Sequence, residues 1–262
     1  MLLHVLSHYR QGHERLFNYS SEVYEPLLDL LERYGPQRRD QRPDMPFWRL
    51  KGDGFWELQN AELCSTDGNR QPTRRELIEY NVAGRFDADN FALMAKNHRL
   101  IDTLAQQLLE AHFPVSIQED IAGEMGFDIR TSLRQRDPKF RQMVLRAYNY
   151  QRAICDFNMR HDNVPIALGA AHIRWKQHHD PCGVPNGLAL CAIHHKAFDR
   201  GSICLDKYMR VVVSGAVNGG EVVRRLFWDF ARKAIVLPPV KENYPGQQFV
   251  EWHRKEVFKG EH

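Results

Sequence analysis

The feature that most constrains this chain is an ordered set of polar side chains between residues 170 and 201, AAHIRWKQHHDPCGVPNGLALCAIHHKAFDRG. His172 follows two alanines and precedes an isoleucine, an apolar context that predicts a strand holding its ring in place. Asn186-Gly187 predicts a tight turn before the apolar run LALC, and His194-His195 begin a segment of helical character that Gly201 closes. The predicted order of strand, loop, strand and helix suits a small ββα unit with one divalent cation at its mouth.

These side chains are of the types that phosphodiester hydrolysis requires. A neutral imidazole can deprotonate water near pH 7, and a divalent cation stabilises the charge that develops on the phosphate and the leaving oxygen. A second imidazole and an amide oxygen are adequate ligands for such a cation. A single histidine is more often a hydrogen-bonded core residue, but the ordered set is far more specific than any one of its members.

The set AAHI, NGLALC, HH and FDRG resembles the HNH endonuclease superfamily, in the branch found in bacterial restriction enzymes. The spacings from His172 to Asn186 (186 − 172 = 14) and to His195 (195 − 172 = 23) fit that branch. The resemblance covers residues 140 to 235. It implies that His172 is the general base, that Asn186 holds the loop and contacts the metal, and that His195 is a ligand of a divalent metal such as Mg²⁺ or Mn²⁺.

Two departures from the family pattern concern metal ligands. Many HNH enzymes carry Asp or His just before the base, whereas this chain has Ala171, so water and phosphate oxygens are expected to complete a sparse ligand set. Relatives also often carry two Cys pairs, or a Cys pair and a C-x-x-H pair, that hold a structural zinc ion. Here the first pair reads CDFN, with Asn158 in place of the second cysteine. The candidate zinc ligands are Cys155, Cys191 and His194, with His161 or Cys182 as substitutes for the fourth.

Three ligands hold zinc less securely than four. Both outcomes therefore stay open: a retained zinc site, or a lost one in which Cys155 and Cys191 are small buried apolar side chains. His178 and His179 are expected to be exposed loop residues.

The N-terminal half is predicted to be mainly helical and has features suited to binding DNA. The net charge is only +3, but arginines are clustered in RRDQR (38–42) and in RTSLRQRDPKFRQMVLR (130–146). Such clusters either bind phosphates or form solvated helix faces. MPFWRLKGDGFWEL (45–58) predicts a small β-hairpin whose aromatic side chains lie in the core. Residues 90–112 predict a helix with Leu93, Leu100, Leu104 and Leu108 on one side, which Phe113-Pro114 ends.

PFWRLKGDGFWEL, followed by AHFPVSIQEDI (111–121), is similar to the sulfur-binding domains of bacterial type IV restriction enzymes, which bind DNA with a phosphorothioate backbone. The resemblance covers residues 1 to 130. It implies that Phe113-Pro114 builds an apolar pocket for the sulfur, with Ile117 as a further wall, and that Arg39 and Arg42 hold the adjacent phosphate. Sulfur is larger and less hydrated than oxygen, so an apolar pocket favours it. Phe113-Pro114 as a plain helix stop is the alternative.

These observations predict an α+β protein of two domains, a sulfur-binding domain over 1–132 and a ββα-metal HNH domain over 133–262. The expected function is a modification-dependent restriction endonuclease acting on double-stranded, phosphorothioated DNA. A homodimer is expected because two active sites cut both strands most easily. No run is long enough to cross a membrane, and a cytoplasmic location is expected. Two alternatives are an HNH enzyme that reads a methylated or hydroxymethylated base, and a DNA-binding module with a decayed nuclease site, which Ala171 and CDFN favour.

Overall fold

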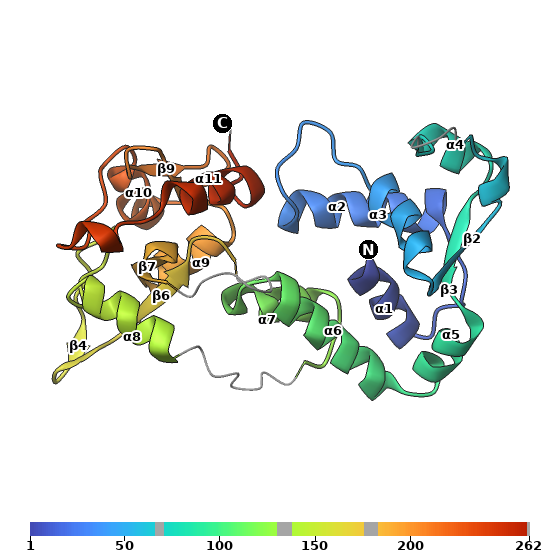
Figure 1. The fold of residues 1–262 in the computed structure, drawn as a ribbon, viewed down its shortest axis with the longest axis horizontal. Coiled ribbons are helices and arrows are strands. Elements are labelled where there is room, and N and C mark those ends of the chain that lie inside the picture. The colour runs from blue at the N-terminus through green and yellow to red at the C-terminus, as the bar shows by residue number, and fades with distance from the viewer. Residues whose placement is uncertain (66–70, 130–137, 176–182, 261–262) are drawn as a thin grey trace. The chain divides into compact units, whose positions relative to one another are not determined.

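The computed structural model describes residues 1–65, 71–129, 138–175 and 183–260 (Figure 1). The chain divides into two compact units. One comprises Met1–Leu108 and Asp120–Ile129, and the other comprises Leu109–Glu119 and Arg130–His262. The predicted boundary between residues 132 and 133 lies outside the described residues. None of the described helices is long and apolar enough to cross a membrane.

The N-terminal unit is mainly helical and contains one small antiparallel sheet, with strand order β1-β3-β2. The strands are β1 (Phe17–Asn18), β2 (Trp56–Gln59) and β3 (Ala83–Phe86). The helices that begin in this part of the chain are α1 (Leu2–Arg10), α2 (Tyr24–Tyr34), α3 (Asp44–Arg49), α4 (Arg74–Glu79), α5 (Ala88–Ala95), α6 (His98–His112) and α7 (Val115–Glu124). Gly84 in β3 leaves no room for a side chain, because the rings of Trp56 and Phe47 pack directly over it.

The hairpin predicted over residues 45–58 is wrong. The first aromatic run forms α3 and a 3-10 turn (Leu50–Asp53), and only the second run is a strand, which pairs with β3. Asp44 in the first turn and a proline on either side of it favour the start of a helix, because proline fixes a helical φ and needs no amide partner there. The core assignment of the aromatics is confirmed for Phe47 and Trp56, whose buried rings meet edge to face at 6.0 Å.

The helix predicted over residues 90–112 is confirmed, but it is broken into α5 and α6, and its buried face is displaced by one residue from the predicted one. Its buried side chains are Met94, Ile101, Ala105 and Leu109, whereas Leu93 is 61% exposed. The Asn97 side chain accepts a hydrogen bond from the backbone amide of Leu100 at 3.1 Å, which caps the start of α6. The buried positions on the two sides of the break, Met94 and Ile101, are seven residues apart, so the stripe continues across it and is displaced from the predicted one by a single residue in both helices.

The C-terminal unit is built on the β6–β7 hairpin (Figure 1). Its helices are α8 (Pro138–Ala147), α9 (Ala192–Asp199), α10 (Glu221–Leu226) and α11 (Gln247–Glu256). Its strands are β4 (Arg160–His161), β5 (Val164–Pro165), β6 (Leu168–His172), β7 (Gly187–Cys191), β8 (Ile203–Leu205) and β9 (Val211–Val213). They form two-stranded antiparallel sheets in which β4 pairs with β5, β6 with β7 and β8 with β9. The predicted order of strand, loop, strand and helix is confirmed, as is the α+β class.

The two faces of this hairpin are covered by different helices. All five residues of β7 are buried, and Leu188 and Leu190 join a core that includes Phe140 and Val144 of α8. Burying each such side chain contributes about 1.5–3 kcal/mol. Gly187 lies against Phe140 and Val144, so the face of the hairpin that bears Gly187 carries α8, while Leu188 and Leu190 point to the opposite face. Gly169 lies against His195, so the other face carries α9.

Candidate active site and metal cluster

His172 is the last residue of β6 and pairs with Gly187 across the hairpin. Its partly buried ring stacks on the ring of Phe140, with centroids 3.8 Å apart and planes 8° apart. The missing side chain at Gly187 lets Phe140 and Val144 approach the strand at this position. The imidazole is therefore held flat against α8 at the end of the strand.

Asn186 is buried and binds the backbone of the β6–β7 loop. Its side-chain oxygen accepts a hydrogen bond from the amide of Arg174 at 2.8 Å, and its side-chain nitrogen donates to the carbonyl of the same residue at 3.0 Å. The amide of Ile173 also donates to the carbonyl of Asn186 at 3.0 Å. Both polar atoms of the side chain thus clamp the loop, and the contact of Asn186 with a metal stays a prediction.

His195 lies on the second turn of α9, with its ring over Gly169 of β6. A Cβ atom at Gly169 would lie 3.2 Å from Nδ1 of His195. Because successive residues of a strand point to opposite faces, Gly169 and His172 have opposite orientations. His172 and His195 therefore approach the hairpin from opposite faces, although one ββα unit carries both.

Asp199 is a candidate functional residue to which the sequence pattern assigned no role. It ends α9, one turn after His195, and its Oδ2 lies 3.2 Å from Nε2 of His195. The same oxygen accepts a hydrogen bond from the hydroxyl of Ser116, which belongs to the same compact unit. Oδ1 is buried without a hydrogen-bond partner in the described part of the chain. The i, i+4 spacing within HHKAFD was the signal for this pair.

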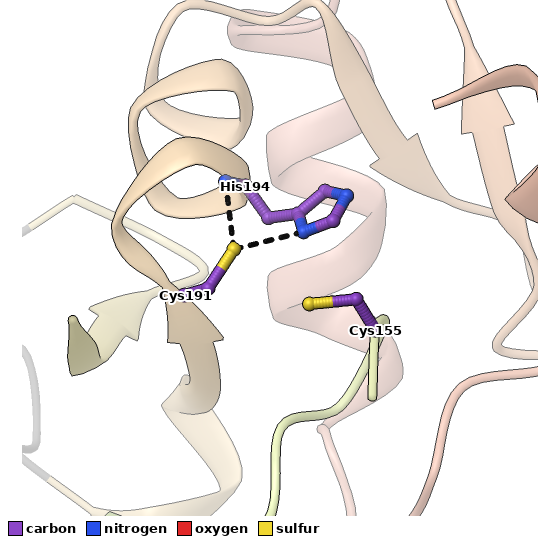
Figure 2. Close-up of side chains that lie close together, drawn as sticks. All are labelled: Cys155, Cys191 and His194. Carbon is purple, nitrogen blue, oxygen red and sulfur yellow. Dashed lines mark hydrogen bonds between the residues drawn. The ribbon is translucent and has the colours of Figure 1, made fainter. Parts of the chain in front are cut away.

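Cys155, Cys191 and His194 form a buried cluster whose ligand atoms all lie within 4.8 Å of one another. Figure 2 shows the sulfur of Cys155 directed toward the other two side chains, which come from the end of β7 and from α9. Nδ1 of His194 lies 3.1 Å from the sulfur of Cys191, and Nε2 lies 2.7 Å from the carbonyl oxygen of Leu226. A histidine that donates one N–H to a carbonyl directs the lone pair of its other nitrogen toward a metal.

The two sulfurs of the cluster differ in their affinity for a proton. A hydrogen bond between the two thiols lowers the pKa of Cys191 to about 4 and raises the pKa of Cys155 above its ordinary value. Cys191 also caps the N-terminus of α9, where its sulfur accepts a hydrogen bond from the amide of His194. Thiolates are the form in which cysteine binds metals. The donor set of two sulfurs and one imidazole therefore fits a zinc ion.

Of the two proposed substitutes for a fourth zinc ligand, His161 is described by the structure and does not join the cluster. His161 is exposed on β4, and Asn158 is exposed in the segment before it. Cys182, His178 and His179 lie outside the described residues. Over the part of the chain that the structure describes, three side chains of the cluster could serve as metal ligands.

Phe113-Pro114 forms the turn between α6 and α7. The amide of Phe113 still donates to the carbonyl of Leu109 at 2.9 Å, and its own carbonyl accepts from the side chain of Gln118 at 2.7 Å. The helix stop predicted for this pair is therefore confirmed. The Phe113 ring lies 6.1 Å from the ring of Trp175, and Ile117 is buried.

The two arginines predicted to hold phosphate lie in the loop between α2 and α3. Arg39 is exposed. Arg42 forms an ion pair with the buried carboxylate of Asp44, with a shortest distance of 2.6 Å. This hydrogen bond raises the pKa of the Arg42 guanidinium. The guanidinium is half exposed, so the carboxylate orients it while leaving one side open to solvent.

Comparisons with known proteins match different families to the two halves of the chain. Residues 1–130 match the family model of the ScoMcrA-like DNA sulfur-binding domain, and residues 152–206 match the model of the HNH endonuclease domain. No curated protein matches the chain.

Solved structures similar to the chain include proteins that act on modified DNA. The sulfur-binding domain of ScoMcrA in complex with phosphorothioated DNA is 24% identical, with a TM-score of 0.42 over 47% of this chain and 82% of that one. The phosphorothioation-dependent type IV restriction endonuclease ScoMcrA is 21% identical, with a TM-score of 0.40 over 47% of this chain and 24% of that one. The modification-dependent restriction endonuclease TagI is 21% identical, with a TM-score of 0.35 over 50% and 41%.

Proposed function

We propose that this chain, which joins a ScoMcrA-like DNA sulfur-binding domain to an HNH endonuclease domain, is a restriction enzyme that binds phosphorothioated DNA and hydrolyses a nearby phosphodiester bond. The observation that carries the proposal is the union of the two domains in one chain. A domain that finds a mark and a domain that cuts DNA together make a cut that depends on the mark. The proposed boundary between them follows residue 132.

In the proposed reaction His172 is the general base that takes a proton from the attacking water. Stacking on Phe140 supports this role, because a ring held in one plane loses little freedom when it accepts a proton at a defined position. Asn186 positions the loop that follows His172 through its two bonds to Arg174. Arg174 lies two residues beyond His172, the last residue of β6. The two hydrogen bonds of Asn186 therefore also fix where this strand ends.

We assign His195 as a protein ligand of a catalytic divalent ion, Mg²⁺, Mn²⁺ or a similar one. When bound, that ion stabilises the charge on the phosphate and the leaving oxygen. Two features of the chain support this assignment. The imidazole of His195 is partly exposed, which an ion shared with DNA requires, and its Nε2 contacts the buried carboxylate of Asp199. Ala171 leaves positions for water and phosphate oxygens in the ligand set.

For the second metal position we propose structural zinc bound by Cys155, Cys191 and His194. The cluster brings together two thiols and an imidazole whose other nitrogen is already engaged by Leu226. Zinc prefers such donors in a closed tetrahedral site. The fourth ligand is assigned to a water molecule or to Cys182.

We propose that Phe113-Pro114 reads the sulfur atom and that Arg39 and Arg42 hold the adjacent phosphate. The sharp turn between α6 and α7 displays an apolar pair at its tip, with buried Ile117 supporting it. A phosphorothioate sulfur gains from apolar contact, whereas a phosphate oxygen loses hydration there without compensation. The pairing of Arg42 with Asp44 keeps its guanidinium in one orientation, which suits a bidentate contact with phosphate.

The deciding experiment compares duplexes that differ in one phosphorothioate, with binding measured by gel shift and cleavage measured in Mg²⁺ or Mn²⁺. The wild-type enzyme is expected to bind and cut the modified duplex preferentially. Phe113→Ala should reduce this preference by roughly 5- to 30-fold, since an apolar contact with one atom contributes about 1–2 kcal/mol. Val115→Ala, at an exposed position two residues away, serves as the matched control.

Each remaining outcome identifies another function. Equal cutting of both duplexes would leave a nuclease without sulfur recognition, and a preference for duplexes with a methylated base would assign the domain to a base mark. Binding without cleavage in any common divalent ion would identify a DNA-binding module with a decayed nuclease. Under the proposed function the enzyme acts in the cytoplasm as a homodimer, and sedimentation of the complex with modified DNA tests the dimer.

A further inference from the structure

We propose that Asp199 is the positioning residue of His195: it holds Nε2 of that imidazole so that Nδ1 is left for the metal. The proposal rests on the proposed function, in which His195 is the metal ligand. It adds a residue and selects which nitrogen of the ring binds. Asp199 acts through His195 and does not touch DNA or the metal.

The first observation is the geometry of the pair. Residues four apart on a helix lie on the same face, and Nε2 of His195 lies 3.2 Å from Oδ2 of Asp199. The side chain of His195 is 27% exposed and that of Asp199 is 1% exposed. The carboxylate therefore lies on the protein side of the ring, away from the solvent that brings in ion and substrate.

The second observation is the position of the other nitrogen. Nδ1 faces the backbone of β6 at Gly169, where even a Cβ atom would lie only 3.2 Å away. Ala171 points to the same face of the strand as Gly169, because the two residues are two apart. Nδ1 thus lies beside the strand that ends in His172, whereas Nε2 is directed toward the interior.

The third observation is that the protein buries this carboxylate with few partners. Burying a charged group is costly unless hydrogen bonds replace its hydration. Ser116 and His195 both approach Oδ2, while Oδ1 has no hydrogen-bond partner within the described ranges. His253 lies nearby, but burial lowers its pKa to about 4, so it stays neutral at pH 7. A carboxyl group buried with so few partners is best explained by the imidazole that it orients.

The test uses Asp199→Asn, which keeps the shape of the side chain and replaces its carboxyl group with an amide. In the metal-free full-length protein at pH 8, NMR of isotope-labelled histidine reports which nitrogen of His195 carries the proton. The wild type is expected to hold the proton on Nε2, and the variant to populate both tautomers. Mn²⁺ added below saturation should broaden the Nδ1 signal of the wild type more than the Nε2 signal.

The second readout is Mn²⁺ affinity, measured by calorimetry in the absence of DNA. Loss of a carboxylate that orients a metal-binding histidine typically weakens binding 10- to 100-fold, and the same loss is expected here. In cleavage assays the Mn²⁺ concentration for half-maximal rate should rise, while the rate at saturating Mn²⁺ is largely retained. Asp229→Asn removes an exposed, ion-paired carboxylate from the same unit and is expected to change neither quantity.

Two further variants separate the failure of this inference from the failure of the proposed function. His195→Ala should weaken Mn²⁺ binding by itself, and Asp199→Asn added to it should have no further effect. If His195→Ala leaves Mn²⁺ binding unchanged, the metal assignment in the proposed function is wrong. If His195→Ala weakens binding but Asp199→Asn changes neither the tautomer nor the affinity, only the positioning role is overturned. Selective broadening of Nε2 would also overturn it, because the metal would then bind the nitrogen that the proposal assigns to Asp199.

Discussion

The closed Cys155–Cys191–His194 cluster and the open site around His195 lie in the same ββα unit, and they differ in exposure and in donor chemistry. The three side chains of the cluster are 8% exposed or less, and two of them are thiols. His195 is partly exposed and is backed by a carboxylate. Zinc sites that only stabilise a fold are closed, whereas catalytic metal sites keep positions for water and substrate. The two sites are therefore suited to different tasks.

Adjacent residues of one helix connect the two sites. His194 points into the closed cluster and donates toward Leu226, while His195 turns toward β6. Successive residues of a helix are about 100° apart around its axis, so fixing one side chain also fixes the direction of the next. Cys191 further anchors the first turn of α9 through its cap to the amide of His194. We infer that the closed cluster holds the helix on which the open site depends.

The largest expected effect comes from removing the proposed base. His172→Ala should lower the cleavage rate by roughly 10²- to 10⁴-fold, the usual contribution of a general base. Binding of modified DNA should stay within about 2-fold of the wild type, because recognition is assigned to the other domain. Single-turnover cleavage and gel shift on the same duplex measure the two quantities. His161→Ala, at an exposed position of the same unit, is the control, and an equal loss of cleavage there would remove the special role of His172.

Disrupting the closed cluster should act first on stability. Cys191→Ser removes a proposed zinc ligand but leaves a hydroxyl that can still cap α9, so the melting temperature of the C-terminal unit should fall by roughly 10 °C or more through loss of the metal. Withholding Mg²⁺ should instead stop cleavage without lowering the melting temperature. Calorimetric scans with and without each ion measure the difference. Cys204→Ala changes a buried cysteine that is not in the cluster and should cost much less.

The sequence predicted the ββα unit well because its signals are local. A strand, a turn, a second strand and a helix follow one another within the stretch from β6 to α9, and their functional side chains stand at fixed spacings. The 45–58 hairpin failed for the opposite reason. Alternating aromatics there pack against Gly84, which is remote in sequence, and a helix and a strand both allow that contact. Asp199 was missed because its meaning depends on burial, which residue type alone does not reveal.

Acidification should destabilise the packing behind the open site. The pKa of His253 is lowered to about 4 by burial, so the unfolded chain binds a proton more readily than the folded one between pH 6.5 and 4. Stability from this group is complete above pH 6.5 and falls by about 3 kcal/mol as the pH drops to 4. Denaturant unfolding of wild type and His253→Gln across this range isolates the contribution. Parallel pH profiles for the two proteins would contradict it.

The smallest effect is expected at Asn186, which is as buried as the closed cluster but belongs to the open site. Asn186→Ala removes both hydrogen bonds to Arg174 and leaves a backbone N–H and C=O to find other partners, at a cost of about 1–2 kcal/mol. Denaturant unfolding measures this cost, with Asn218→Ala at an exposed position as the control. Cleavage should also fall, because β6 ends less rigidly after His172. If Asn186 contacts the metal as well, excess Mg²⁺ should restore part of the rate. If it only clamps the loop, excess Mg²⁺ should restore none.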